Sequence, residues 1–319
     1  MDLQKILEDI RSDRVKKVIL DTDTDNEVDD QFALAYAIGA SKVDLLSVNA
    51  APFSHPERDI DHKMGADASY VEIGRVLKAY KKDCPIPYFR GAEKPIDQND
   101  GRPVDSPAAR NIIDTAMASD EPIYVLGIGA GTNIASALMM EPAIKDRIVV
   151  IWLCANELHC DHVYEYNLDQ DYAAGRYILD SGVPFIMCPA WNVTGVLWVN
   201  MWTIKEQLAG VSPLCELLWQ LINQVWYWVG RPEGYGRTLW DIASVAILEV
   251  PEYAHIKKIK APVFTPDHKF AFPEDRHEIL YLEKLDRDGI FADVWKTLPA
   301  IKCTGEYRAR WTEPEENNG

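Results

Sequence analysis

The feature of this sequence that most constrains its fold is the alternation of short apolar runs with longer segments of helical pattern. The apolar runs predict strands at residues 17–20, 45–48, 123–128, 147–153 and 183–187. Helical patterns fill most of the gaps, at residues 30–38, 66–80, 108–118, 132–139 and 172–179. Such alternation is typical of parallel strands joined by right-handed crossovers, with helices on both faces of the sheet. The sequence therefore predicts an α/β protein with an open, mostly parallel sheet.

A dense group of carboxylates follows the first predicted strand. Residues 21–30 contain five aspartates and one glutamate, directly after three apolar residues at 18–20. Carboxylates repel one another at close range, so a cluster at a strand end needs a cation or extensive hydrogen bonding. An all-oxygen ligand set suits a hard ion such as Ca²⁺ or Mg²⁺. The segment therefore predicts a metal site.

Three other interpretations of the acidic segment are weaker. A charge run is usually a solvated loop, but apolar segments frame this one on both sides. An EF-hand needs glycine at its sixth position and glutamate at its twelfth, where this chain has Asn26 and Phe32. An aspartyl phosphotransferase loop also begins with Asp-x-Asp after a strand, but it does not account for the second acidic pair.

Two further motifs follow predicted strands and are expected at the same rim of the sheet, because ligands bind beyond the carboxyl ends of parallel strands. One is Gly-Ala-Gly-Thr-Asn at residues 129–133, and the other is Cys-Ala-Asn at residues 154–156. The glycine segment lacks a complete phosphate-binding pattern, and no Walker lysine is present. It favours a tight turn that offers backbone carbonyls and amides to a ligand.

Composition and charge exclude several classes of function. With 319 residues, 47% of them hydrophobic, the chain can bury a large core. A formal charge of −17 argues against nucleic acid and anionic membranes as partners, and permits small neutral substrates. A charged amino terminus and the lack of a membrane-spanning run favour a cytoplasmic protein. The six scattered cysteines are expected as reduced thiols, and those at 154 and 160, with the histidines at 159 and 162, match no common zinc site.

Several segments, in the same order along the chain, resemble the calcium-dependent nucleoside hydrolases, which cleave the N-glycosidic bond of ribonucleosides. The segments are Lys-Val-Ile-Leu-Asp-Thr-Asp at 17–23, Asp-Asp at 29–30, Arg-Gly-Ala-Glu-Lys-Pro at 90–95, Gly-Ala-Gly-Thr-Asn-Ile-Ala at 129–135, Glu-Tyr-Asn at 165–167 and Trp-Asp at 240–241. The resemblance implies one Rossmann-like α/β domain over residues 1–319. The acidic tail, 306–319, is expected to be flexible. A homo-oligomer is expected, with aromatic side chains between 191 and 240 in the core or in subunit contacts.

The resemblance also implies a Ca²⁺ site. Carried over residue by residue, Asp23 is a ligand and the catalytic base, Asp30 a bidentate ligand and Asp241 a further ligand. The carbonyl of Ile128 is the backbone ligand, and Asp21 supports the site from behind.

The same resemblance implies a sugar site. Asp29 and Asn167 bind the ribose 2′ and 3′ hydroxyls, and Glu165 lies at the far side of the sugar. Cleavage of a ribosyl bond passes through an oxocarbenium-like state, which requires an activated water, negative groups around the sugar and help for the leaving group. A metal-bound water with a neighbouring carboxylate base meets the first requirement, and the aspartate cluster meets the second.

The chain departs from the family pattern at the base. The family usually places its base four residues before the acidic pair, whereas Asp23 is six residues before Asp29 and Asp25 is four before it. We favour Asp23, because this choice keeps the strand register and leaves the extra residues in a loop. Asp25 is then expected to face solvent.

A second departure affects the leaving group. Trp240 stands where purine-cleaving members carry a histidine acid, and an indole N–H donates a hydrogen bond but is no useful proton donor. Trp240 can stack on a flat base, and Tyr235 and Tyr227 are possible substitutes as acid. Three hypotheses follow: a Ca²⁺-dependent N-ribohydrolase, a hydrolase of another ribosyl or carbohydrate compound, and a non-catalytic calcium-dependent sugar binder.

Overall fold

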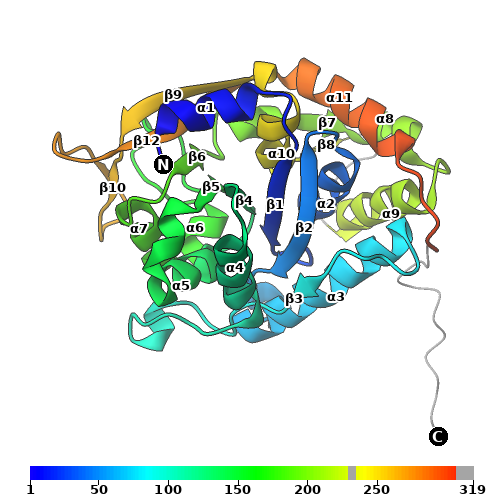
Figure 1. Cartoon of the computed structure of the whole chain (residues 1–319). Coiled ribbons are helices and arrows are strands. Elements are labelled where there is room, and N and C mark those ends of the chain that lie inside the picture. Colours follow the sequence, from blue (N-terminus) through cyan, green and yellow to red (C-terminus); the bar gives the residue numbers. More distant parts are fainter. Residues whose placement is uncertain (229–234, 307–319) are drawn as a thin grey trace, which may run out of the picture.

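The computed structural model describes residues 1–228 and 235–306, without the side chains of 225–228. A central sheet of eight strands has the order β3-β2-β1-β4-β5-β6-β12-β9 (Figure 1). Its strands are β1 (Lys16–Thr22), β2 (Val43–Ala50), β3 (Tyr88–Phe89), β4 (Ile123–Gly127), β5 (Ile148–Leu153), β6 (Phe185–Cys188), β9 (Ala254–Lys260) and β12 (Glu278–Leu285). All neighbouring strands are parallel except β9, which is antiparallel to β12.

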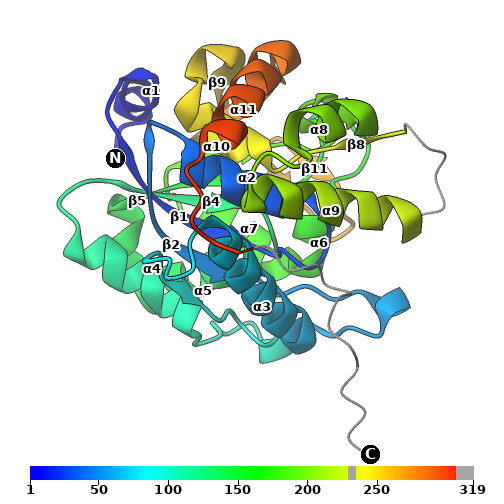
Figure 2. The same cartoon turned by 90° about the vertical axis from the view of Figure 1, so that its right-hand side faces the viewer.

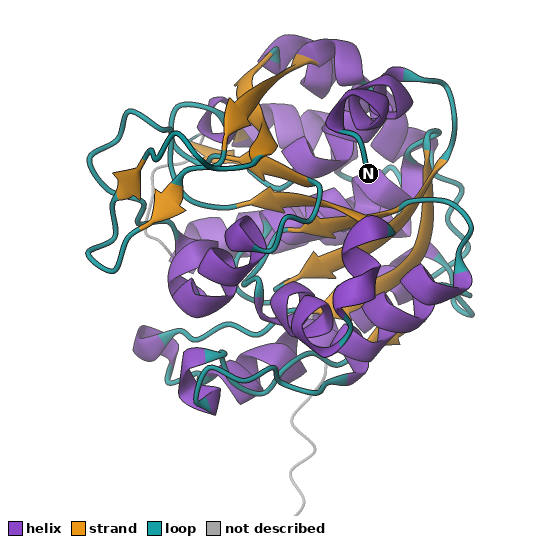
Figure 3. Cartoon of the chain, turned by 60° about the vertical axis from the view of Figure 1, so that its left-hand side comes forward, coloured by secondary structure: helices purple, strands orange, loops and turns teal. Residues whose placement is uncertain are grey.

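Helices cover both faces of the sheet (Figure 3). One face carries α1 (Leu3–Arg11), α2 (Asp29–Gly39), α3 (His62–Tyr80), α8 (Met201–Leu208), α9 (Pro213–Trp228), α10 (Ile242–Glu249) and α11 (Arg287–Ala300). The other carries α4 (Pro107–Ala118), α5 (Thr132–Met140) and α7 (Tyr172–Asp180). On the first face α3 and α9 lie side by side (Figure 2). The predicted fold class is therefore confirmed.

Side-chain alternation along β1 explains why both faces are covered. Val18 and Leu20 pack in the hydrophobic core of one face, and Ile19 packs in that of the other. All three side chains are fully buried, as expected for a central parallel strand. The same alternation continues in β4 and β5, so the sheet separates two cores.

The five predicted strands and five predicted helices are all present, with ends that differ by a few residues. The sequence pattern did not predict α1, the edge pair β9 and β12, or the short strands β7 (Trp198–Asn200), β8 (Gly236–Thr238), β10 (Val263–Phe264) and β11 (Phe270–Ala271). Strand β9 carries three lysines and is largely exposed, which protects a sheet edge but weakens its apolar signal. None of the described helices is long and apolar enough to cross a bilayer.

The strand order creates a switch point at β1. The chain passes from β1 to β2 and β3 on one side, and then crosses to β4 on the other side of β1. Loops that leave such a pair of strands diverge, and ligands of open α/β sheets bind in the crevice between them. The acidic segment follows β1 directly, so the topology places it at this crevice.

Candidate active site

A cavity opens at the carboxyl ends of β1, β4 and β5. It is lined by every residue predicted to hold the metal or the substrate, namely Asp23, Asp29, Asp30, Ile128, Glu165, Asn167, Trp240 and Asp241. These residues come from four separate segments of the chain. The fold therefore brings the predicted set together at one place, although the role of each residue stays a prediction.

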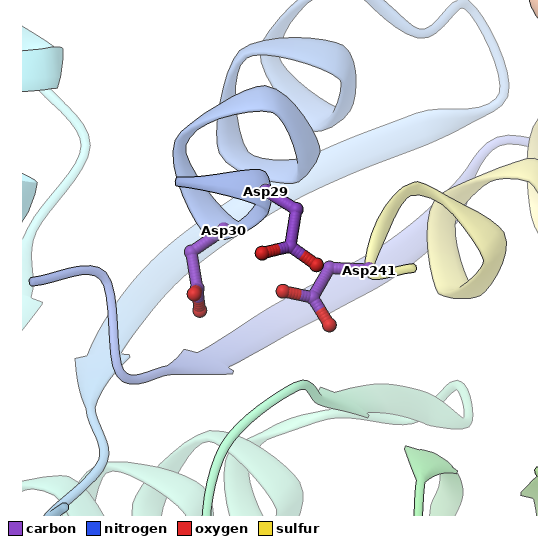
Figure 4. Close-up of side chains that lie close together, drawn as sticks. All are labelled: Asp29, Asp30 and Asp241. Atoms are coloured by element: carbon purple, nitrogen blue, oxygen red, sulfur yellow. The ribbon is translucent and has the colours of Figure 1, made fainter. Parts of the chain in front are cut away.

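Three carboxylates that line the cavity lie close together (Figure 4). Asp29, Asp30 and Asp241 each offer an oxygen atom, and these atoms lie within 4.8 Å of one another. Asp29 and Asp30 stand in the first turn of α2, and Asp241 is the N-cap residue of α10. Two helix amino termini, with their partial positive charge, therefore face the cluster and offset part of its repulsion.

The donor set of this cluster fits a hard cation. The three side chains are no more than 4% exposed, and Asp29 Oδ1 has no hydrogen-bond partner among the described residues. A buried carboxylate oxygen without a partner is costly, and a cation that accepts oxygen ligands removes this cost. Two members of the cluster, Asp30 and Asp241, belong to the predicted ligand set. The third member is Asp29, whereas the third predicted side-chain ligand is Asp23.

Asp23 lies beside this cluster, bound to Asp30 through the backbone. Its N–H donates to Asp30 Oδ1 at 3.2 Å, and the hydroxyl of Thr22 donates to the same oxygen at 2.5 Å. The side chain of Asn26 donates to Asp23 Oδ2 at 3.1 Å. The backbone of Asp23 also lies close to Gly129, where an added Cβ atom would stand 3.1 Å from the Asp23 nitrogen and 2.8 Å from the Ala51 Cβ atom. The loops would have to shift to admit a side chain at residue 129.

The protein environment disfavours four charged carboxylates here. Burial, followed by the charges of Glu27 and Asp30, raises the pKa of Asp29 to about 8. Burial also raises the pKa of Asp30 to about 7, although the hydrogen bond from Thr22 lowers this pKa. The pKa values of Asp23 and Asp241 are raised well above the usual range, again chiefly by burial. Without a cation the cluster therefore holds protons that a bound cation would displace.

Asp21 lies behind the cavity and does not line it. Its fully buried carboxylate accepts hydrogen bonds from Asn133 Nδ2, at 3.1 Å to Oδ2 and 3.4 Å to Oδ1. Burial raises its pKa to about 7, and these hydrogen bonds partly oppose that rise. The Asn133 side chain also donates to the backbone of Ala50 and accepts from that of Ala92. The predicted glycine segment thus ties Asp21 to two neighbouring loops.

Two of the predicted sugar-binding residues, Glu165 and Asn167, line the same cavity as the aspartates. Glu165 caps α6 (Tyr166–Gln170) and accepts hydrogen bonds from the backbone of Asn167 and Leu168. A third bond comes from the N–H of Ala155, a non-glycine residue with φ of 57°. Such a left-handed conformation is strained and is typical of functional sites. The Asn167 amide donates to the Leu153 carbonyl at 3.1 Å, which fixes its orientation.

A profile of the inosine-uridine preferring nucleoside hydrolases matches residues 18–291. The chain belongs to this family. The predicted class of enzyme, a hydrolase of N-glycosidic bonds, is therefore confirmed.

Relatives of this nucleoside hydrolase differ in the bases that their names specify. It is 28% identical over 255 residues to the non-specific ribonucleoside hydrolase RihC of Escherichia fergusonii, covering 74% of this chain and 80% of the relative. Its identity to the pyrimidine-specific ribonucleoside hydrolase RihB of Escherichia coli strain SE11 is 28% over 197 residues, 54% of this chain and 58% of the relative. A purine-preferring ribonucleoside hydrolase from Gardnerella vaginalis shares the fold, with a TM-score of 0.68, 19% identity and coverage of 90% and 99%.

The structure corrects the prediction for Asp25 in this nucleoside hydrolase. Asp25 was expected to face solvent, but its side chain is only 7% exposed and accepts from Arg58 Nη2 at 2.8 Å. The expectation was wrong because the loop folds back onto η1 (Pro56–Arg58), which supplies the cation that a buried carboxylate requires. Asp25 is not among the described residues that line the cavity, whereas Asp23 is, and the choice of Asp23 as the base stays a prediction.

Trp240 lines the cavity, and the guanidinium of Arg237 lies 5.9 Å from its ring centroid. Arg237 also forms an ion pair with Glu27. Of the two tyrosines considered as acids, Tyr235 is 44% exposed and is not among the described residues that line the cavity. The side chain of Tyr227 lies outside the described residues.

Sequence reasoning missed six residues of the cavity wall, namely Asn26, Glu27, Leu153, Tyr166, Ala190 and Trp191. Asn26 and Glu27 belong to the stretch between Asp23 and Asp29, whose greater length was the available signal. The structure shows that this longer stretch forms part of the wall of the cavity.

Proposed function

We propose that this nucleoside hydrolase is a Ca²⁺-dependent N-ribohydrolase that acts on ribonucleosides or related ribosides. The observation that carries the proposal is the convergence of a buried three-carboxylate cluster and a set of sugar-directed polar side chains in one cavity. A metal-binding site alone would not call for Glu165 and Asn167 in the same cavity. Membership of a family of hydrolases favours an enzyme over a non-catalytic sugar binder.

In this proposal Asp30 and Asp241 hold the cation, with Asp23 and the carbonyl of Ile128 as further ligands. When bound, Ca²⁺ supplies charge that lowers the pKa of a coordinated water. The Asp23 carboxylate, beside Asp30, accepts the proton from the attacking water. Asp29 has one buried oxygen without a protein partner, so it is free to accept a hydrogen bond from a ribose hydroxyl or to bind the cation.

Charge around the sugar is the second contribution of these residues. The ribosyl group gains positive charge as the glycosidic bond breaks, and nearby carboxylates stabilise that charge in a cavity of low dielectric constant. Glu165 is held by three backbone N–H donors and therefore keeps a fixed orientation. Burial raises its pKa to about 7, and these bonds oppose that rise.

The leaving group receives little acid catalysis in this proposal. Trp240 offers a flat ring and an N–H donor, and the described tyrosine in the cavity, Tyr166, has a hydroxyl that is already bonded to protein atoms. We therefore propose a preference for ribosides whose leaving group departs without protonation. A hydrolase of another ribosyl or carbohydrate compound is the second candidate, and the same departure from the family at Trp240 supports it.

Calorimetric titration with Ca²⁺ tests the proposal. The wild type is expected to bind one Ca²⁺, and Asp30→Ala is expected to lose most of the affinity because it removes a cluster ligand. Asp44→Ala, at an exposed position of β2, is the matched control and is expected to bind as the wild type does. Equal affinity of the wild type and Asp30→Ala would refute the site assignment. Hydrolysis of inosine and of p-nitrophenyl riboside, each with Ca²⁺ and with chelator, tests the activity.

The homo-oligomeric state and the cytoplasmic location stay predictions. Sedimentation equilibrium at micromolar concentration checks the first of them, and a purely monomeric species would contradict it. Microscopy of the protein fused to a fluorescent label checks the second.

A further inference from the structure

The stretch between Asp23 and Asp29 is attached to the protein at three successive residues. Asp25 is bound by Arg58, through its backbone carbonyl at 2.9 Å and its carboxylate at 2.8 Å. Asn26 accepts a hydrogen bond from the hydroxyl of Tyr166 at 2.9 Å. Glu27 forms an ion pair with Arg237. The three partners belong to η1, α6 and β8, so the stretch is a fixed wall of the cavity.

Asn26 makes a further contact that the other two residues do not make. Its Nδ2 donates to Asp23 Oδ2 at 3.1 Å, and its backbone N–H donates to the Asp23 carbonyl at 2.8 Å. An ionised carboxylate only accepts hydrogen bonds, so the Asn26 amide must present its nitrogen to Asp23. Its oxygen then faces Tyr166, whose hydroxyl is a donor. One orientation of the amide therefore satisfies both neighbours, whereas the reverse orientation would place the amide oxygen against the Asp23 carboxylate, where the two acceptors repel.

The hydroxyl of Tyr166 has a second acceptor within reach. It lies 2.9 Å from the Ser54 carbonyl as well as 2.9 Å from Asn26 Oδ1. Ser54 is in turn bound by Gln170, which donates to its carbonyl at 3.2 Å and accepts from its N–H at 2.8 Å. The Tyr166 hydroxyl is thus held by the loop after β2, and its hydrogen bond in turn restrains the side chain of Asn26.

We propose that Asn26 is a positioning residue for Asp23, holding one carboxylate oxygen so that the other faces the attacking water, and that Tyr166 holds Asn26. This inference rests on the proposed function, because it assumes that Asp23 is the base. A carboxylate that turns freely reaches its productive orientation only part of the time, and loss of hydrogen bonds behind such a group typically costs about 10- to 100-fold in activity.

The test compares Asn26→Leu, Tyr166→Phe and the double variant at saturating Ca²⁺. Asn26→Leu is expected to lower kcat about 10- to 100-fold while KM changes by less than about twofold. The loss should be equal for inosine and for p-nitrophenyl riboside, because activation of water does not depend on the leaving group. Asp25→Asn is the matched control: it alters the neighbouring attachment of the same loop but no contact of Asp23, and its kcat is expected within about threefold of wild type.

The double variant distinguishes positioning of Asp23 by Asn26 from a general loss of order in the stretch between Asp23 and Asp29. If Tyr166 acts through Asn26, Tyr166→Phe lowers kcat in the wild type but adds less than about twofold in the Asn26→Leu background. Independent, multiplicative losses would overturn the proposal, as would an Asn26→Leu variant with wild-type kcat or one that raises KM alone. Thermal unfolding checks each variant, and Asn26→Ala replaces Asn26→Leu if the latter does not fold.

Failure of the proposed function gives a different result. A wild type that hydrolyses neither riboside refutes that function and, with it, the role of Asn26. An active wild type whose kcat is insensitive to Asn26 refutes the positioning role alone.

Discussion

Replacing Asp30 by asparagine is expected to stabilise the protein in chelator while it abolishes the response to Ca²⁺. The asparagine Oδ1 can still accept from Thr22 and from the N–H of Asp23, which both bind the same oxygen of Asp30. The change removes one negative charge from a buried cluster of three carboxylates, each with an oxygen atom within 4.8 Å of those of the other two. At that separation two unit charges repel by about 3 kcal/mol at an effective dielectric constant of about 20.

The pKa of Asp30 gives an independent upper bound. Burial raises it from 3.8 to about 7, so at pH 8 the ionised group destabilises the fold by about 4 kcal/mol at most. Because the folded pKa lies above the unfolded value, the wild type in chelator loses stability as pH rises from about 4 through about 7. The advantage of Asp30→Asn should therefore be greatest at pH 8 and vanish near pH 4.

Thermal unfolding in chelator and in excess Ca²⁺ measures both effects. After partial relaxation we expect a gain of about 1 to 3 kcal/mol at pH 8, which corresponds to a rise in Tm of about 1.5 to 4.5 °C for a chain of 319 residues. Calcium should raise the Tm of the wild type, because a ligand of the folded state stabilises it by mass action, and should leave that of Asp30→Asn unchanged. Asp44→Asn, at an exposed position, is the control. A variant that is less stable than the wild type in chelator at pH 8 would refute the reasoning.

Three further predictions concern the base, the leaving group and a distant ion pair. Asp23→Asn should lower kcat by at least about 100-fold and Asp25→Asn only slightly, whereas the reverse pattern would place the base two residues later. If Trp240 does not act as an acid, kcat/KM should be far higher for p-nitrophenyl riboside than for inosine. The Trp240→His variant should then recover some inosine cleavage. Rapid inosine cleavage by the wild type would show that another acid acts. Burial raises the pKa of Asp9, but the hydrogen bonds from Arg14 outweigh this and leave it lowered. Asp9→Asn should therefore cost about 1 to 2 kcal/mol of unfolding free energy at pH 7, and the difference from wild type should shrink as pH falls through the lowered pKa of Asp9; a difference that does not shrink in acid would contradict the assignment.

The parts of the site that follow β1 directly could be predicted from the sequence, because a strand and a charge cluster are both local patterns. Asp21, Asp23, Asp29 and Asp30 belong to this class. Asp241 carries no comparable signal, since Trp240-Asp241 is an ordinary pair in a helical context. Its place in the site came from the resemblance to a family, and the packing of α10 against the sheet explains why the fold brings it there.

The interactions of the long loop could not be predicted, because they join residues far apart in the chain. Nothing in the sequence near Asn26 indicates that Tyr166 contacts it, and nothing near Asp25 indicates Arg58 as its partner. The charge of Asp25 suggested solvent, and only the three-dimensional path of the loop shows a buried ion pair. Polar contacts between loops depend on loop geometry, which has no periodicity from which to predict it.

The distance along the chain between Asp30 and Asp241 has a consequence for biosynthesis. More than 200 residues separate these two members of one cluster. At about 5 to 20 residues per second, the ribosome needs about 10 to 40 seconds to pass from the first to the second. During that interval the amino-terminal aspartates lack Asp241 beside them. A cation that requires Asp241 as well is therefore captured only after α10 has been synthesised and has packed, so metal uptake would report that the chain has folded at least as far as α10.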